Sequence, residues 1–260
     1  MFDRYRDVQK LNFGFKNELY SGYLGEQKVF LKKYVIREGR EREDRLKVQT
    51  ELSCYQHIKN LALPKIIEAN SEEHYLVLEW LDFAPFPSDQ AVLLAAIKVW
   101  EEQLPTISAE FVPLVDWSYY EQNLFRRARA LGELGIIPAE RVIERISRNQ
   151  PELSGGFTRF SHGDLYPGNL KLHNGKPMLF DYEHAHQDCP FYDVACLKVH
   201  FFGTPEAALL DSYTASFPAD DQALYEAMQL RRSIDILFAF KNHRTMVGFG
   251  RAERAVGSLL

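Results

Sequence analysis

HGDLYPGNL at positions 162–170 is the most informative segment of this chain. Asp164 and Asn169 stand five positions apart, which is the separation of the catalytic Asp and the metal-binding Asn in the H-R-D-x-x-x-x-N loop of kinases. Gly163 takes the place of the Arg in that pattern, and His162 is predicted to have a structural and not a catalytic role. The spacing predicts a loop for phosphoryl transfer, in which Asp164 orients and deprotonates an acceptor hydroxyl.

A second metal ligand is expected just beyond a short hairpin. Asn174-Gly175 is a strong hairpin signal between two apolar stretches, and Asp181 follows the second of them. Mg²⁺ is a hard cation that takes oxygen ligands, commonly one or two from the protein. The carboxylate of Asp181 and the amide oxygen of Asn169 are therefore predicted to bind Mg²⁺ from the two ends of one hairpin.

Three motifs together resemble the aminoglycoside phosphotransferase and choline kinase-like family. They are HGDLYPGN at 162–169, DYE at 181–183 and YDVA at 192–195, and the resemblance runs from about Gly14 to the last helices. It implies an α+β, two-lobed protein-kinase-like fold, in which a small antiparallel sheet with one main helix precedes a larger, mostly helical lobe. It further implies an enzyme that phosphorylates small molecules, and an Asp193 that anchors the catalytic loop. A capping role at a helix N-terminus is the other interpretation of Asp193.

Length and composition are those of an ordinary globular protein. The 260 residues suffice for one large domain or two small lobes, and the net charge of −5 argues against a nucleic-acid partner. The N-terminus lacks the apolar run of a signal peptide, and no apolar stretch is long enough to span a bilayer. Three cysteines without CxxC spacing favour a reducing, cytoplasmic location.

The pattern of apolar residues divides the chain near residue 81. Strands are predicted at 18–24, 28–34 and 74–80, and a helix from about 40 to 60. DFAPFP at 82–87 holds two prolines, which disfavour helix and central strand. We therefore expect a nucleotide-binding lobe at 1–81 and a lobe with the catalytic loop and acceptor site at 82–260. Helices are expected in the second lobe at about 88–104, 118–134, 138–149 and 219–246.

A lysine that clamps the phosphates is expected on the third strand, as in the V-A-I-K motif of kinases. Lys32 in VFLK at 29–32 fits best, with Lys33 as the alternative, because neighbouring strand residues point to opposite faces. Glu51 lies on an apolar helix face, where a carboxylate is costly unless it is paired. Lys32 is its predicted partner, and Lys47 is the local alternative.

Other nucleotide contacts are predicted from short segments. Gly14 and Asn17 belong to a glycine-poor turn whose backbone N–H groups could cradle phosphate. Glu79 and Leu81 enter the lobe boundary, where the backbone would bind the base of ATP or of GTP, with ATP preferred. Glu183 is left open between a water-mediated metal contact, a substrate contact and a loop-stabilising role. His184 and His186 have no further His or Cys cluster nearby in sequence, which favours hydrogen-bonded loop histidines over a zinc site.

The acceptor is the least defined part of the prediction. Aminoglycoside-inactivating relatives often end in an acidic segment, whereas this chain ends AVGSLL, so choline, ethanolamine, thiamine and sugars stay open as acceptors. Four carboxylates are candidate contacts for a polycation, and WSYY at 117–120 is a cation–π wall or part of the core. The carboxylates are Glu183, Asp188, Asp116 and Glu121.

Two other classes of function compete with a small-molecule kinase. One is a pseudokinase-like module that binds nucleotide without transfer, and the presence of the full set of site residues counts against it. The other is a protein kinase, which is disfavoured because A-P-E is absent and only twelve positions separate Asp181 from Asp193.

Overall fold

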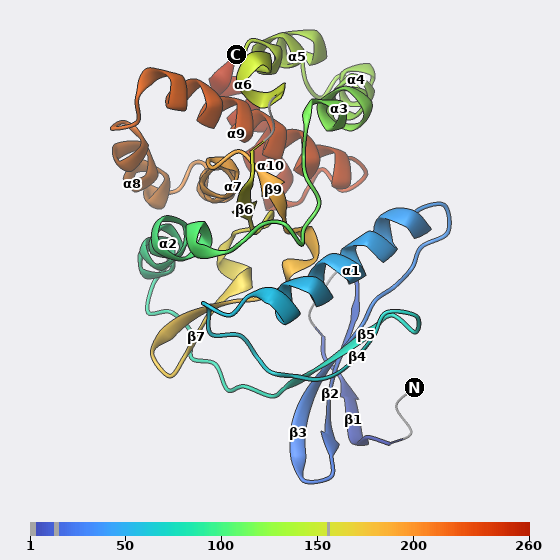
Figure 1. Ribbon diagram of the computed structural model, residues 1–260. Helices are drawn as coiled ribbons and strands as arrows, with labels where there is room; N and C mark the ends of the chain where they lie inside the picture. Colours follow the sequence, from blue (N-terminus) through green and yellow to red (C-terminus); the bar gives the residue numbers. More distant parts are fainter. Residues whose placement is uncertain (1–3, 13–15, 155–156) are drawn as a thin grey trace.

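The N-terminal part of the chain is an antiparallel sheet with one long helix, and the remainder is mostly helical (Figure 1). The structure is a computed structural model, and it describes residues 4–12, 16–154 and 157–260. The sheet has the strand order β1-β2-β3-β5-β4. Its strands are β1 (Arg6–Lys10), β2 (Glu18–Leu24), β3 (Gln27–Lys33), β4 (Ile66–Asn70) and β5 (Tyr75–Glu79), and the helix is α1 (Glu41–His57).

Alternation along β3 separates two layers of core. Val29 and Leu31 are fully buried on the outer face of the sheet, where they pack with Tyr75 and Val77 of β5. On the opposite face of the sheet, Leu76 and Leu78 of β5 belong to the main core. Lys32 falls on that helix-facing side because strand side chains alternate between faces. The sheet thus aims Lys32 at α1.

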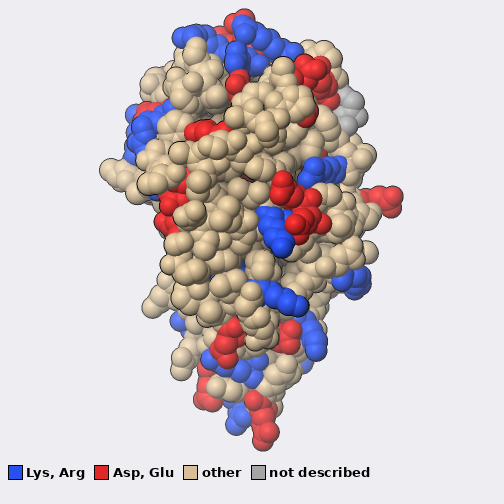
Figure 2. All heavy atoms as spheres, turned by 90° about the vertical axis from the view of Figure 1, so that its left-hand side faces the viewer, with Lys and Arg blue, Asp and Glu red and all other residues tan. Residues whose placement is uncertain are grey.

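The helical part is built around α9 (Ala219–Ala239), which packs against α7 and α10 and also contacts α4 and α5. On the side of the molecule that carries α2 and α8, charged side chains gather toward the two ends of the molecule and in a mixed cluster between them, and much of the remaining surface is uncharged (Figure 2). The longer helices are α2 (Asp89–Lys98), α4 (Phe125–Glu133), α5 (Ala139–Ser147), α7 (Tyr192–Phe201), α8 (Pro205–Thr214), α9 and α10 (Val247–Leu259). Shorter ones are α3 (Trp117–Tyr119) and α6 (Gln150–Ser154), with π-helical turns at Val99–Gln103 and Tyr120–Leu124 and 3₁₀ turns at Leu104–Thr106, Pro167–Asn169 and Tyr182–His184.

Two small two-stranded sheets frame the catalytic loop. β6 (Arg159–Ser161) pairs with β9 (His186–Asp188), and β7 (Leu170–His173) pairs with β8 (Lys176–Leu179). The β7–β8 turn is formed by Asn174 and Gly175, whose φ angles of 50° and 73° suit this dipeptide. The predicted hairpin is therefore confirmed, and it places the ends of β7 and β8 side by side.

The α+β arrangement predicted from the sequence is confirmed, with corrections at several boundaries. The helix expected at 219–246 ends at Ala239, and a separate helix begins at Val247. The helix expected at 118–134 is interrupted by the π-helical turn at Tyr120–Leu124. No helix formed by the described residues is both long and apolar enough to cross a membrane.

Candidate active site

The catalytic loop is anchored from α7. The carboxylate of Asp193 accepts hydrogen bonds from the backbone N–H groups of His162 and Gly163, at 2.8 and 3.0 Å. The His162 ring is fully buried, and its Nε2 lies 2.8 Å from the carbonyl oxygen of Phe180. Asp193 thus makes the loop contact that the resemblance implied, and His162 joins the loop to the residue before Asp181.

Gly163 is required by the shape of this loop. Its φ is +78°, a conformation that residues other than glycine disfavour. A Cβ atom there would lie 2.0 Å from the carbonyl oxygen of His184. The loop therefore passes the turn at residues 182–184 at a distance that only glycine allows.

Both carboxylate oxygens of Asp164 are held. Its Oδ1 forms an ion pair with the guanidinium of Arg232 from α9, and its Oδ2 lies 3.2 Å from Nδ2 of Asn169. Burial raises the pKa of Asp164, but the charge and hydrogen bond of Arg232, together with His184 and His162, outweigh burial and hold the pKa below its usual range. The side chain is 21% exposed, so Asp164 is an ionised carboxylate that an incoming group can reach.

Lys32 is buried among three carboxylates. Its Nζ lies 2.6 Å from Glu51, 2.6 Å from Asp181 and 3.5 Å from Glu183. Burial would lower the pKa of Lys32, but Asp181 and Glu51 raise it well above its ordinary value. For Glu51, burial outweighs the Lys32 charge and raises the pKa to about 7. The predicted Lys32–Glu51 ion pair is present, and the role of this pair in nucleotide binding stays a prediction.

The alternative partners that the sequence left open form other pairs. Lys33 is exposed on the opposite side of β3 and lies 3.5 Å from Glu18. Lys47 lies 3.3 Å from Glu43, one turn earlier in α1. Neither of these two lysines pairs with Glu51.

A group of oxygens suited to a cation lies at the end of the β7–β8 hairpin. Glu51, Asp181 and Glu183 each offer a carboxylate oxygen, and these oxygens all lie within 4.8 Å of one another. Asp181 has φ +62°, a left-handed conformation that Asp adopts more readily than most residues. Of the two predicted ligands, the structure joins Asp181 to this group, whereas the amide nitrogen of Asn169 donates to Asp164.

Asn169 is nevertheless adjacent to this group along the hairpin. The backbone N–H of Phe180 donates to the Asn169 carbonyl at 3.0 Å, which ties Asn169 to the residue before Asp181. Because its amide nitrogen faces Asp164, the amide oxygen points elsewhere, and it accepts no hydrogen bond from the described residues. The ends of the hairpin therefore meet, as the sequence predicted.

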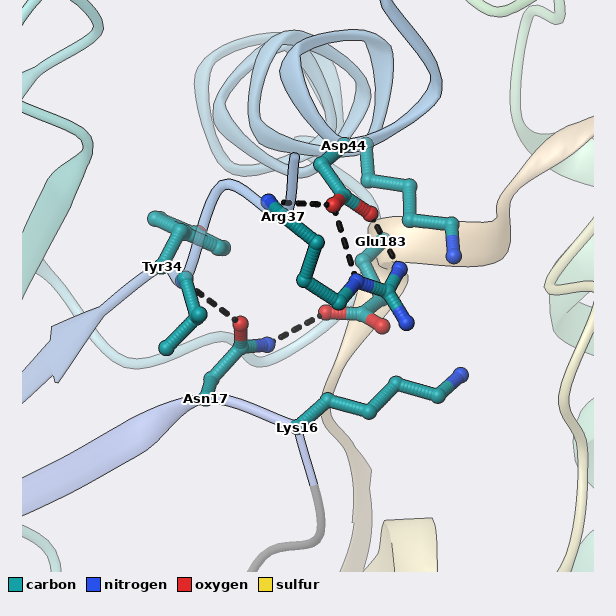
Figure 3. Close-up of a pocket in the computed structure, with 8 residues that line it drawn as sticks. Lys16, Asn17, Tyr34, Arg37, Asp44 and Glu183 are labelled. Atoms are coloured by element: carbon teal, nitrogen blue, oxygen red, sulfur yellow. Dashed lines mark hydrogen bonds and ion pairs between the residues drawn. The ribbon is translucent and has the colours of Figure 1, made fainter. Parts of the chain in front are cut away.

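Asn17 closes a small pocket between the sheet and α1 (Figure 3). Its Nδ2 donates to Glu183 at 2.7 Å, and its Oδ1 accepts from the N–H of Val35 at 3.3 Å. Glu183 is thus a buried, multiply bonded carboxylate, with His184 also 3.3 Å away. The pocket is lined by Lys16, Asn17, Tyr34, Val35, Arg37, Asp44, Lys47 and Glu183. The predicted contact Gly14 lies outside the described residues.

At the predicted base-binding segment, the backbone of Glu79 is partly engaged. Its N–H donates to the Lys65 carbonyl at 3.0 Å, and its carboxylate accepts from the Lys65 N–H at 2.8 Å. Leu81 is half-buried and forms no backbone hydrogen bond with the described residues. Of the two predicted residues, Leu81 is the one whose backbone N–H has no acceptor in the described part of the chain.

Two neighbouring arginines of α9 were not predicted. Arg232 contacts Asp164, and Arg231 is buried against Asp188, which also lies 2.6 Å from His186. Arg231 also lies over the rings of Tyr119, Tyr120 and Tyr192. Asp188 is therefore unavailable to an acceptor, and YY at 119–120 packs on a protein cation. The only signal in the sequence was an Arg-Arg pair within a largely apolar helix.

Comparison with known proteins agrees with this site. A model of the phosphotransferase enzyme family matches residues 12–230. The chain belongs to this family. No curated protein sequence matches it at a significant level.

The structural similarity to solved structures with the same fold extends over almost the whole chain. A thermostable mutant of aminoglycoside phosphotransferase APH(4)-Ia, in a ternary complex with ADP and hygromycin B, has a TM-score of 0.71 at 14% identity, covering 98% of this chain and 93% of that chain. The choline kinase LicA from Streptococcus pneumoniae has a TM-score of 0.65 at 17% identity, covering 99% of this chain and 94% of that chain. At these identities the likeness establishes the kinase-like fold of this family member.

Proposed function

We propose that this phosphotransferase family member is a Mg²⁺-dependent kinase that transfers the γ-phosphate of a nucleoside triphosphate, ATP in preference to GTP, to a hydroxyl of a small polar acceptor. The supporting observation is that the two ends of one hairpin carry the two halves of the site: Asn169 contacts Asp164 of the anchored loop, and Asp181 contacts Lys32, which Glu51 also holds. We further propose that residues 1–81 bind the nucleotide and residues 82–260 supply the catalytic loop and acceptor site.

In this proposal the cluster around Lys32 binds the triphosphate. Glu51 holds the Lys32 ammonium, which orients the α- and β-phosphates. The backbone N–H of Leu81 binds the edge of the base. The APH(4)-Ia relative was crystallised with ADP, which supports nucleotide binding at the same fold.

The donor set around Asp181 fits Mg²⁺. Three carboxylates surround one ammonium, so negative charge remains to be neutralised, and all the candidate ligands are hard oxygens. Asp181 and Asn169 would hold the ion, and Glu183 is a third oxygen donor nearby. Bound there, the ion would neutralise charge on the phosphate oxygens.

Asp164 provides the chemistry at the acceptor. Its carboxylate is ionised and partly exposed, and both of its oxygens are oriented by neighbours. It accepts the hydroxyl proton as the new oxygen–phosphorus bond forms and the bond to the β-phosphate oxygen breaks. In phosphoryl transfer such positioning contributes much of the rate.

Replacement of Asp164 tests the proposal. The purified chain is incubated with ATP, Mg²⁺ and a panel of hydroxyl-bearing metabolites, and ADP release is measured. Asp164→Asn should lower acceptor-dependent turnover by ~10²–10⁴-fold, as expected for loss of a general base, while nucleotide affinity is largely kept. Asp220→Asn, at an exposed position at the start of α9, is the matched control and should leave turnover unchanged.

Three results would contradict this assignment. Full turnover by the Asp164→Asn variant would remove Asp164 from the chemistry. Nucleotide binding by the natural chain without ADP release, whatever the acceptor, would favour a module that only binds nucleotide. Label on the protein itself would indicate a protein kinase.

A further inference from the structure

The approach to Asp164 is lined by positive charge. Arg232 contacts the carboxylate directly, and its Nε is buried without a hydrogen-bond partner in the described part of the chain. The Arg232 side chain is 18% exposed, and a guanidinium with five N–H donors can hold a second acceptor besides Asp164. A group that binds Asp164 therefore meets Arg232 at the same time.

Two further basic residues lie near this pair, since the charges of Arg251 and Asp164 both act on His200 and the charge of Asp164 also acts on Lys16. Arg251 of α10 is half-buried and donates to the carbonyl oxygen of His200, and it has no carboxylate partner among the described residues. The His200 ring lies 5.5 Å from that of Tyr166, two residues after Asp164. Lys16 borders the pocket next to Glu183 and extends without contacting the other residues drawn (Figure 3).

Four of the carboxylates near this charge are already paired, whereas Asp89, which acts on the His200 ring through its charge, is exposed at the start of α2. Asp188 is buried with Arg231, Asp235 lies 2.6 Å from Arg127, and Glu183 is bonded to Asn17 and Lys32. Asp164 itself is paired with Arg232. A polycationic acceptor would therefore find no free carboxylate among these four groups, and it would be repelled by Arg232.

We propose that the acceptor carries an anionic group, a carboxylate or a phosphate, close to the hydroxyl that is phosphorylated, and that Arg232 binds this group. This inference rests on the kinase function proposed above. Arginine presents a planar fork of donors that matches carboxylate and phosphate oxygens. When one N–H group of Arg232 donates to Asp164 and others donate to the anionic group, the acceptor hydroxyl is placed beside the Asp164 carboxylate.

Matched sets of acceptors that differ only in charge test this inference. One set is glycerate, glyceramide and 3-aminopropane-1,2-diol, and the other is glucose 6-phosphate, glucose and 6-amino-6-deoxyglucose. ADP release with ATP and Mg²⁺ gives kcat/KM for each. In at least one set the anionic member should exceed the neutral one by about tenfold or more, with the amine lowest, because each 1.4 kcal/mol of differential binding is tenfold. The set that responds distinguishes carboxylate from phosphate.

Two variants of Arg232 separate recognition from structure. Arg232→Gln should lower kcat/KM for the anionic acceptor by about 10²-fold, largely through KM, and should bring the anionic and neutral members toward parity. Arg232→Lys keeps the charge and should retain part of the preference. Nucleotide affinity and the unfolding midpoint of both variants report whether the fold is intact.

The outcomes distinguish failure of this inference from failure of the kinase function. Preference for a neutral or amine acceptor, or an unchanged preference in a folded Arg232→Gln variant, overturns the inference and leaves the kinase function standing. Absence of ADP release with every acceptor, despite nucleotide binding, overturns both.

Discussion

Gly163 occupies a backbone position that is fixed from two sides. Its N–H is held by Asp193, and the His184 carbonyl that it faces is held by Nδ1 of His186 at 2.6 Å. Neither segment can move aside without losing a hydrogen bond in a buried region. The glycine of the loop is thus explained by packing, independently of its place in a motif.

Substitution by alanine at two glycines with positive φ separates the cost of the backbone conformation from the cost of a steric clash with the added Cβ atom. Gly25 has φ +63° and open space where a Cβ atom would lie, whereas Gly163 has φ +78° and a Cβ would meet the His184 carbonyl. Gly25→Ala should lower the free energy of unfolding by ~1–2 kcal/mol, the cost of the left-handed conformation. Gly163→Ala should cost ~3 kcal/mol or more, because the loop must also shift. Urea denaturation measures both, and equal losses would contradict the close approach.

Strand β3 and helix α1 meet through a buried ion pair. Lys32 is 5% and Glu51 is 2% exposed, and the hydroxyl of Tyr34 donates to the same Glu51 oxygen at 2.9 Å. Such a pair contributes little net stability over apolar residues, but removing one partner leaves the other buried and unpaired. The two elements therefore depend on Lys32 for the charge balance of their interface.

Methionine at the two adjacent lysines of β3 tests this dependence. Lys32→Met should lower the free energy of unfolding by ~3–5 kcal/mol at pH 8, as for one partner of a buried pair. Burial already raises the pKa of Glu51 to about 7, and loss of the ammonium raises it further. A carboxyl whose pKa is raised by folding stabilises the fold at pH values below its pKa in the unfolded chain, and this contribution is lost as the pH rises through the folded pKa. The loss of stability in Lys32→Met should therefore be smaller at pH 5.5 than at pH 8.

Lys33→Met is the matched control, because Lys33 is exposed and lies 3.5 Å from a partly exposed Glu18. It should change the free energy of unfolding by no more than ~0.5 kcal/mol. Equal effects of the two substitutions would contradict the inward orientation of Lys32.

Elements with strong local signals were predictable from the sequence, and contacts across long separations were not. The Asn174-Gly175 turn and the alternation that selects Lys32 depend on neighbouring residues only. Arg232 meets Asp164 across 68 positions, so no local pattern indicates the contact. The break of the predicted 219–246 helix after Ala239 has no proline or glycine to mark it, since Phe240 and Lys241 follow directly.

At the scale of the whole molecule, helix α9 contacts two separate polar clusters, one around Asp188 and one around Asp164. Arg231 and Arg232 are consecutive, so their side chains leave the helix about 100° apart. One reaches the buried Asp188 and its tyrosines, and the other reaches Asp164. The position of α9 therefore determines both the packing of the helical part and the positive charge beside the Asp164 carboxylate.

His200 makes the stability of the molecule depend on pH. Burial lowers the pKa of His200 to about 4, assisted by the charges of Arg251 and Arg232, while Asp164 and Asp89 oppose them. The folded pKa is thus below the unfolded value of about 6.5. The contribution to stability is present above pH 6.5 and is lost as pH falls toward 4, because the unfolded chain takes up the proton first.

A comparison of variants between pH 7 and pH 5 tests this histidine, because Glu51, whose pKa burial raises to about 7, also takes up a proton in the folded chain over this range. His200 should lower the free energy of unfolding by ~1–2 kcal/mol over this interval, so the natural chain should end that much lower, relative to its value at pH 7, than His200→Gln does. His243→Gln, at an exposed position between α9 and α10, should keep the slope of the natural chain. Chemical denaturation at closely spaced pH values provides the measurement. If His200→Gln kept the full slope while His243→Gln reduced it, protonation in the α9–α10 connection, and not beside Arg232, would control the acid stability of the fold.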